Sequence, residues 1–195
     1  AWVESGLYEA PKMAEEWVKS LDELEMRYPN VAKSQSGRIG NHIGASESRK
    51  KLYSSVLQAW ARDGNPDKAK EWIDRMIQEE EYPDVLAFNR LLMAYQSAGS
   101  RANDKHSSNN STNKSAERAE EVLRHMQKLY HEPNGFLSDP PNVVSYNIVI
   151  DAWTKRAGHE SLSFRSDKRK GSALDAARRA HGWFEQMKNS GITPN

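Results

Sequence analysis

Polar side chains that can form specific hydrogen bonds recur at two fixed places in this 195-residue chain. The first place directly follows a recurring aromatic residue and holds Ser54, Asn89 and Asn147. The second directly follows a recurring proline and holds Asn30, Asp84, Asn142 and Asn195. An Asn amide both donates and accepts hydrogen bonds, whereas a carboxylate only accepts them. The chemistry of these positions is therefore hydrogen-bonded recognition.

Residues for catalysis or metal binding do not come together in the sequence. With no cysteine there is no disulfide, thiolate zinc site or cysteine nucleophile. The six histidines include no His-Glu-x-x-His pair, and His125 and His131 fall on different faces of a helix. A phosphate-binding loop follows a strand, but Gly37, Gly40 and Gly44 have no flanking strand. We predict that the chain is not an enzyme and uses no metal and no cofactor.

Composition narrows the class of protein further. The formal charge of +1 argues against a strongly basic clamp but allows a local basic face. Only 37% of the residues are hydrophobic, so the core is thin or part of the chain lies outside it. No stretch approaches the roughly 18 apolar residues of a membrane span. The chain begins at Ala1 without methionine, and we expect it to be a piece of a longer protein.

Two sequence patterns repeat along the chain, and both have helical spacing. One begins with an aromatic residue and ends in Ala-aromatic; the other begins with Ala and ends in Met or Leu. Within each, apolar residues fall at i, i+3, i+4 and i+7, which predicts pairs of helices and an all-α fold. First helices are expected at 51–62, 85–97 and 143–156, and second helices at 11–27, 66–80, 115–130 and 173–190.

A single pair of helices this short cannot bury its apolar faces, so the pairs are expected to stack into a solenoid, a right-handed α-α superhelix. Polar, loop-like segments interrupt the repeats. The expected organisation is a partial repeat at 1–30, an insertion at 31–49, a repeat at 50–84, a repeat at 85–142 with insertions near 98–115 and 131–140, and a repeat at 143–195 with an insertion near 157–172.

Residues 83–89 and 141–147 resemble the junction between repeats in pentatricopeptide repeat (PPR) proteins, and 187–195 resembles the end of such a repeat. The tetratricopeptide repeat is the main alternative, but its signature needs Gly where these first helices carry Leu57, Leu92 and Ile150. The resemblance implies binding of single-stranded RNA, one base per repeat. It also implies a role in RNA processing, stability or translation in a mitochondrion or chloroplast, with organellar ribonucleoprotein components as possible partners. It implies no membrane and no small-molecule substrate.

The resemblance also assigns residues to the RNA. The fifth and last residues of a repeat would face one base edge: Ser54 with Asp84, Asn89 with Asn142, and Asn147 with Asn195. The second residue would pack on the base face: Lys51, Leu86 and Val144, of which Lys51 departs from the expected aliphatic type. By the family's code Ser with Asp implies G, and Asn with Asn implies C with weaker U. The expected sequence is 5′-G-Y-Y-3′.

Other interpretations of the same residues remain open. Ser, Asn or Asp beside a helix start commonly caps the helix or forms a turn. The helix stack could instead be a protein-interaction scaffold, for example in a ribosomal assembly, or part of an RNA-processing enzyme. We expect the tryptophans to lie in the core and the pairs Glu15-Glu16, Glu79-Glu80 and Glu120-Glu121 to lie on a solvated face. The basic run 164–170 is expected to be a solvated loop, with phosphate binding as the alternative.

Overall fold

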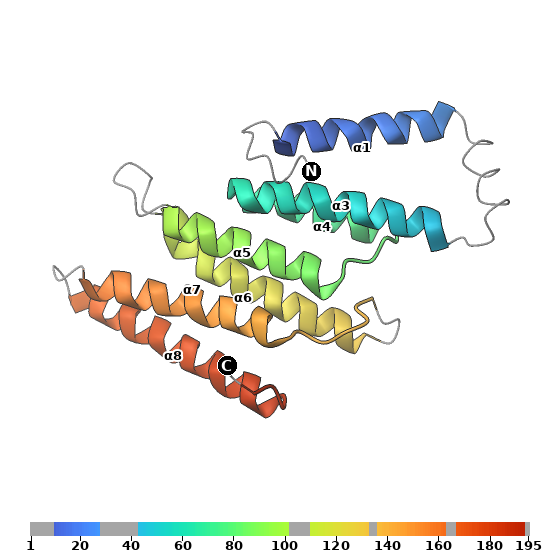
Figure 1. The fold of residues 1–195 in the computed structure, drawn as a ribbon. Coiled ribbons are helices and arrows are strands. Elements are labelled where there is room, and N and C mark those ends of the chain that lie inside the picture. The colour runs from blue at the N-terminus through green and yellow to red at the C-terminus, as the bar shows by residue number, and fades with distance from the viewer. Residues whose placement is uncertain (1–9, 28–42, 102–109, 133–135, 163–166, 194–195) are drawn as a thin grey trace. The chain divides into compact units, whose positions relative to one another are not determined.

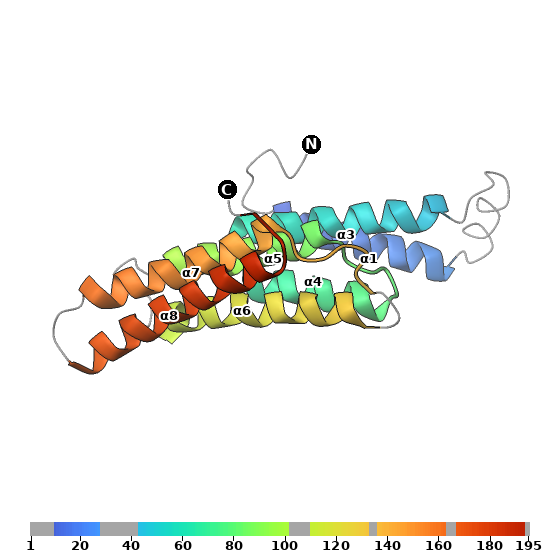
Figure 2. The ribbon, with the colours of Figure 1, turned by 90° about the horizontal axis from the view of Figure 1, so that it is seen from below.

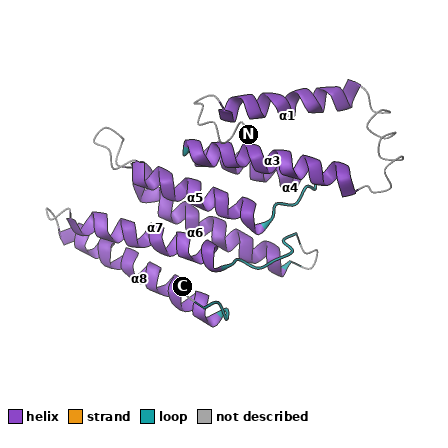
Figure 3. Ribbon diagram, viewed as in Figure 1, coloured by secondary structure: helices purple, strands orange, loops and turns teal. Residues whose placement is uncertain are grey.

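The computed structural model describes residues 10–27, 43–101, 110–132, 136–162 and 167–193. These residues form seven helices and no strand (Figures 1 and 3), which confirms the all-α class. The helices are α1 (Ala10–Arg27), α3 (Ile43–Asp63), α4 (Pro66–Gln78), α5 (Val85–Arg101), α6 (Asn110–His131), α7 (Val143–Leu162) and α8 (Asp167–Asn189). No helix in the described part is long and apolar enough to cross a membrane.

The chain divides into two compact units, residues 1–83 and 84–195. In the first unit α3 pairs with α4, and α1 packs against α3. In the second unit α5 pairs with α6, α7 pairs with α8, and α7 also packs against both α5 and α6. Figure 2 shows α7 and α8 side by side along their length. Consecutive helices thus form hairpins, and within the second unit one hairpin stacks on the next.

The turn between α3 and α4 follows from three adjacent residues. Gly64 adopts φ 74°, and its N–H donates to the Ala61 carbonyl oxygen at 3.2 Å. Asn65 caps α4 by accepting a hydrogen bond from the Lys68 N–H at 3.2 Å, and Pro66 occupies the first turn. Gly tolerates the left-handed conformation, and Pro fits a position whose N–H needs no helical partner. The sequence therefore closes this hairpin within two residues.

Two carboxylates attach α1 to the α3–α4 hairpin. Glu15 Oε1 accepts hydrogen bonds from the indole N–H of Trp60 at 3.0 Å and of Trp72 at 2.8 Å. Asp22 pairs with Arg49 and with Arg75, each at 2.5 Å. The expectation of a solvated Glu15 was therefore wrong, because periodicity does not show which acidic residue meets an indole N–H on a neighbouring helix.

One glutamate in each of the other two acidic pairs is also held by neighbouring side chains rather than simply solvated. Glu79 accepts from the Tyr53 hydroxyl and pairs with Arg75 at 2.7 Å. Burial, reinforced by this donation to Glu79, raises the pKa of Tyr53 to about 12. Burial acts to raise the pKa of Glu79, but the hydrogen bonds from Tyr53 and Arg75 outweigh it and lower that pKa. Glu120 is buried on α6 and pairs with Arg124 at 2.5 Å.

The tryptophans are mostly core residues, as expected. Trp60 and Trp72 are buried in the first unit, and Trp153 and Trp183 in the second. The Trp17 side chain on α1 is 66% exposed, which contradicts the expectation. Trp72 packs against Tyr53 of its partner helix with the ring centroids 5.5 Å apart, whereas no first helix precedes α1 among the described residues. Trp2 lies outside the described residues.

Parts of the segments expected as loops inside the hairpins extend the helices instead, while residues 102–109 and 163–166 lie outside the described residues. α5 continues to Arg101 and α6 begins at Asn110, while α7 continues to Leu162 and α8 begins at Asp167. Ser115, near the start of α6, is buried, so packing supports the helix there against a low intrinsic propensity. Once a helix has nucleated, each added residue gains a backbone hydrogen bond. Residues 167–170 of the basic run are helical, and 164–166 lie outside the described residues.

Candidate nucleic-acid interface

Asn142, the last residue of the 85–142 repeat, is fixed as the N-cap of α7. Its Oδ1 accepts hydrogen bonds from the backbone N–H of Val144 at 3.1 Å and of Ser145 at 3.2 Å. The Asn142 N–H in turn donates to Ser145 Oγ at 3.2 Å, so the two residues form a reciprocal capping box. The expectation of a helix cap at this position is confirmed.

The capping hydrogen bonds determine whether Asn142 presents its amide oxygen or its NH₂ group to a ligand. Because backbone N–H groups can only donate, the atom facing them is the oxygen, and the NH₂ group points away. Asn142 is exposed, and its Nδ2 makes no hydrogen bond to any described residue. The residue therefore presents two N–H donors to solvent.

Asn89, the fifth residue of the same repeat, lies beside Asn142. Its Nδ2 donates to Asn142 Oδ1 at 3.3 Å, and its Oδ1 accepts from Ser145 Oγ at 2.6 Å. The fold thus brings together two residues that are 53 positions apart in the chain. Asn89 is only 5% exposed, which places Asn142 in front and Asn89 behind it as a support.

Asp84, the last residue of the 50–84 repeat, has the same structural role as Asn142. Its Oδ1 accepts from the Ala87 N–H at 2.7 Å and caps α5. Its other carboxylate oxygen accepts no hydrogen bond from the described residues. Asp84 therefore presents an acceptor where Asn142 presents donors. Its expected partner Ser54 is half-buried on α3, in the first unit.

Exposed aliphatic side chains stand at the starts of α5 and α7. Leu86 is 55% exposed and Val144 is 44% exposed, although both are apolar. Asn147 is exposed one helical turn after Val144, on the same face of α7. Lys51 is exposed on α3, and Asn195 lies outside the described residues.

Sequence reasoning missed other residues near these positions. Met93 is exposed on α5, seven residues after Leu86 and therefore on the same face. Lys155 of α7 pairs with Asp151 at 2.7 Å, so the charges on this part of α7 are mixed. The spacing of Leu86 and Met93 could have revealed the exposed Met, but it equally fits a buried stripe.

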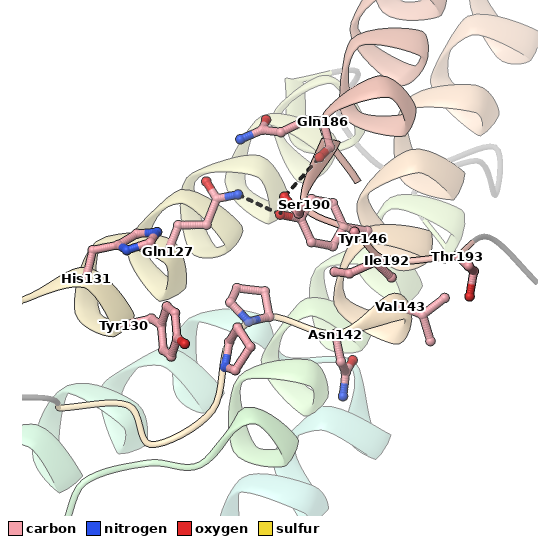
Figure 4. A pocket seen from close by; sticks show the side chains of 13 residues that line it. Gln127, Tyr130, His131, Asn142, Val143, Tyr146, Gln186, Ser190, Ile192 and Thr193 are labelled. Atoms are coloured by element: carbon pink, nitrogen blue, oxygen red, sulfur yellow. Dashed lines mark hydrogen bonds between the residues drawn. The ribbon is translucent and has the colours of Figure 1, made fainter. Parts of the chain in front are cut away.

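Sequence reasoning also missed a cleft beside Asn142 (Figure 4). It has a volume of about 820 Å³ and lies between the end of α6, the segment 140–142, the start of α7 and the end of α8. The Gln127 side-chain amide on α6 donates to the Tyr146 hydroxyl at 2.9 Å and fixes one wall. No local pattern in the sequence marks such a cleft, because it depends on how separate helix ends meet.

These features define a class of protein: an α-helical hairpin repeat protein that presents one capping Asp or Asn between successive repeats. Residues 51–80 match the family described as the PPR repeat, which supports a pentatricopeptide repeat protein. No curated protein is similar enough to the chain to count as a match. PPR repeats are in general non-catalytic RNA-binding elements, so the match supports an RNA-binding repeat protein and an RNA partner. Proteins of this class are commonly organellar.

Proposed function

We propose that the chain binds single-stranded RNA one base per repeat, with the last residue of each repeat contacting the base edge. The observation that carries the proposal is the contact between Asn89 and Asn142, because it joins the two residues assigned to a single base. The same contact leaves the Asn142 donors directed outward. Asn89 acts mainly as the support that holds this amide in place.

The chemistry of Asn142 favours a base edge that offers acceptors. Cytosine presents an acceptor ring nitrogen beside a carbonyl oxygen, whereas the ring nitrogen of uracil carries a proton. Two N–H donors therefore suit cytosine better than uracil. Leu86 and Val144 can contact the two faces of a base bound there, since both side chains are exposed at the starts of neighbouring helices.

Asp84 favours the opposite kind of edge. A carboxylate only accepts hydrogen bonds, and guanine offers two adjacent donors. With Ser54 as its partner, Asp84 is assigned to G, and Asn147 with Asn195 to a second pyrimidine. The proposed sequence is 5′-G-Y-Y-3′, with C preferred at both Y positions. Mitochondrial or chloroplast RNA processing, stability or translation is the corresponding cellular role.

The magnitude of binding limits what this chain does alone. Stacking contributes about 1–3 kcal/mol per base on aromatic side chains, and aliphatic packing falls at the low end. Three bases then give about 3–6 kcal/mol before the cost of association, so affinity is weak. The proposal therefore concerns preference among sequences more than absolute affinity.

The experiment is a competition among short RNAs at low salt. The chain is incubated with a pool randomised over five positions, and bound RNA is separated and sequenced. We expect enrichment of G followed by C and then C or U. Binding without preference at these three positions would contradict the assignment.

A protein-interaction scaffold is the second candidate, and one observation favours it. Exposed Leu86, Met93 and Val144 make the face of α5 and α7 partly apolar, and Lys155 there is paired with Asp151. RNA binding driven by phosphate contacts weakens steeply as salt rises, whereas apolar association does not. Weak RNA binding that is independent of salt and sequence would favour the scaffold.

A further inference from the structure

The cleft beside Asn142 is large enough for a nucleotide. Its volume of about 820 Å³ falls within the roughly 300–1,000 Å³ that small-ligand sites occupy. Figure 4 shows Gln127, Tyr130 and His131 reaching it from α6, Gln186 from α8, and Ser190 from the turn that follows α8. Tyr146 and Ile192 lie across from Tyr130 in the same view.

The segment between α6 and α7 contributes to the cleft and distinguishes this junction from the preceding one. Six residues, 79–84, separate α4 from α5, whereas eleven residues, 132–142, separate α6 from α7. Pro140 and Pro141 of the longer segment line the cleft. Proline has no N–H, so this wall offers apolar ring surface and carbonyl oxygens but no backbone donor.

The lining is polar but almost without charge. The described residues that line it include no Lys, Arg, Asp or Glu, and His131 is the one titratable side chain among them apart from the tyrosines. A phosphate or a carboxylate would find no Lys or Arg to pair with among the described lining residues. The lining instead combines aromatic and proline rings with amide and hydroxyl groups. This combination suits a flat, uncharged ligand whose edge both donates and accepts hydrogen bonds.

Several of these groups are available for a ligand. The Tyr130 ring is 38% exposed, and it packs edge-on against His131 with the centroids 5.2 Å apart. The Tyr130 hydroxyl, the Gln186 side-chain amide and the Thr193 hydroxyl form no hydrogen bond with another described residue. Tyr146 is already bonded to Gln127, so it forms the fixed wall. One face of the cleft thus offers a stacking ring and the other offers free polar groups.

We propose that this cleft holds one nucleobase of the bound RNA, stacked on Tyr130 and hydrogen-bonded by Gln186 or Thr193. The inference rests on the RNA binding proposed above. Asn142 links the two sites, because it lines the cleft and also presents its amide beside Asn89. A strand that contacts Asn142 therefore passes the mouth of the cleft, and its phosphates stay outside the neutral lining. The base in the cleft adds a contact beyond those of the fifth and last residues of the repeats.

The test places the fluorescent base 2-aminopurine at each position in turn of an RNA that the chain binds. Stacking on an aromatic ring quenches this fluorophore. Each labelled RNA is titrated with the original chain and with Tyr130→Ala, Tyr130→Phe and Tyr82→Ala. Tyr82 is a matched control, since its side chain is 37% exposed and lies outside the cleft.

We expect quenching at one position that Tyr130→Ala abolishes, together with RNA affinity about 5- to 150-fold weaker. Tyr130→Phe retains the ring and stays within about 2-fold of the original affinity, as does Tyr82→Ala. RNA binding that is unchanged by Tyr130→Ala at every labelled position would overturn the cleft proposal and leave the proposed function standing. A chain that binds none of the RNAs would overturn both.

Discussion

Replacing Glu15 with alanine should loosen α1 from the α3–α4 hairpin. Glu15 Oε1 is the acceptor for two indole N–H groups, those of Trp60 and Trp72, at 3.0 Å and 2.8 Å. Both tryptophans are buried, so each N–H would lose its partner where water reaches it poorly. The substitution therefore acts on two hydrogen bonds at once.

The magnitude follows from the cost of unsatisfied donors. Leaving a buried donor without an acceptor costs about 1–3 kcal/mol, and bonds to a charged group lie in the upper part of the range. Glu15 itself is half-buried, which allows water to replace part of the loss. We expect a decrease of about 2 kcal/mol in the free energy of unfolding for Glu15→Ala. For Glu15→Gln we expect about 1 kcal/mol, because the amide oxygen can still accept.

The assay is urea unfolding followed by tryptophan fluorescence and far-UV circular dichroism. With a slope of about 2 kcal/mol per molar urea, Glu15→Ala should lower the midpoint of the first unit by about 1 M. Glu16→Ala is the matched control, since Glu16 is exposed on the same turn and its side chain accepts no hydrogen bond from the described residues; its backbone carbonyl accepts one from Ser20. Equal effects of Glu15→Ala and Glu16→Ala would refute the reasoning.

Three further changes have defined outcomes. Glu80 follows α4 with φ 57°, and the equivalent position after α8 is Gly191 with φ 75°. Because glycine adopts this left-handed conformation without strain, Glu80→Gly should raise the free energy of unfolding in urea by about 0.5–1 kcal/mol. An unchanged midpoint would contradict this. The pKa of Tyr53, about 12, lies above its ordinary value of 10, so the stability from its neutral hydroxyl is complete below pH 10 and is lost as pH rises to about 12. Absorbance titration at 245 nm should lose its step near pH 12 in Tyr53→Phe, and persistence of that step would exclude Tyr53 as its source. Ser54→Asn should shift the preferred first base from G toward U in the RNA selection, and continued selection of G would argue against the register of repeats.

The hairpins could be predicted because the apolar stripes are strong local signals. The stripe Ala69, Trp72, Ile73 and Met76 is buried along α4 as expected, and Pro83 and Pro141 mark the junctions. Helix ends inside the hairpins could not be predicted in the same way. The composition of residues 110–115 favours a loop, but residues 115 and 116 are buried, and tertiary packing overrides intrinsic propensity there.

The residue types of the candidate site could be predicted from the sequence, but the arrangement of their side chains could not. Sequence equivalence pairs Asn89 with Asn142, yet only the folded structure shows that Asn89 is buried and that Asn142 faces outward. The partners of Glu15 and the cleft around Tyr130 depend on contacts between helices distant in sequence. Such contacts have no periodic signature in one chain.

Asn142 offers the most direct test of the proposed function, because its role as the cap of α7 can be separated from its role in contacting a base. Asp caps a helix as well as Asn does, so Asn142→Asp should leave the free energy of unfolding within about 0.5 kcal/mol. It replaces the outward donors with an acceptor, whereas Asn142→Ala removes the cap and the base contact together. The decisive measurement is the affinity of the original chain and of Asn142→Asp for two RNAs that differ only by C or U at the second position. We expect the original chain to prefer C and Asn142→Asp to prefer U. An unchanged preference in a stably folded Asn142→Asp variant would contradict the central claim.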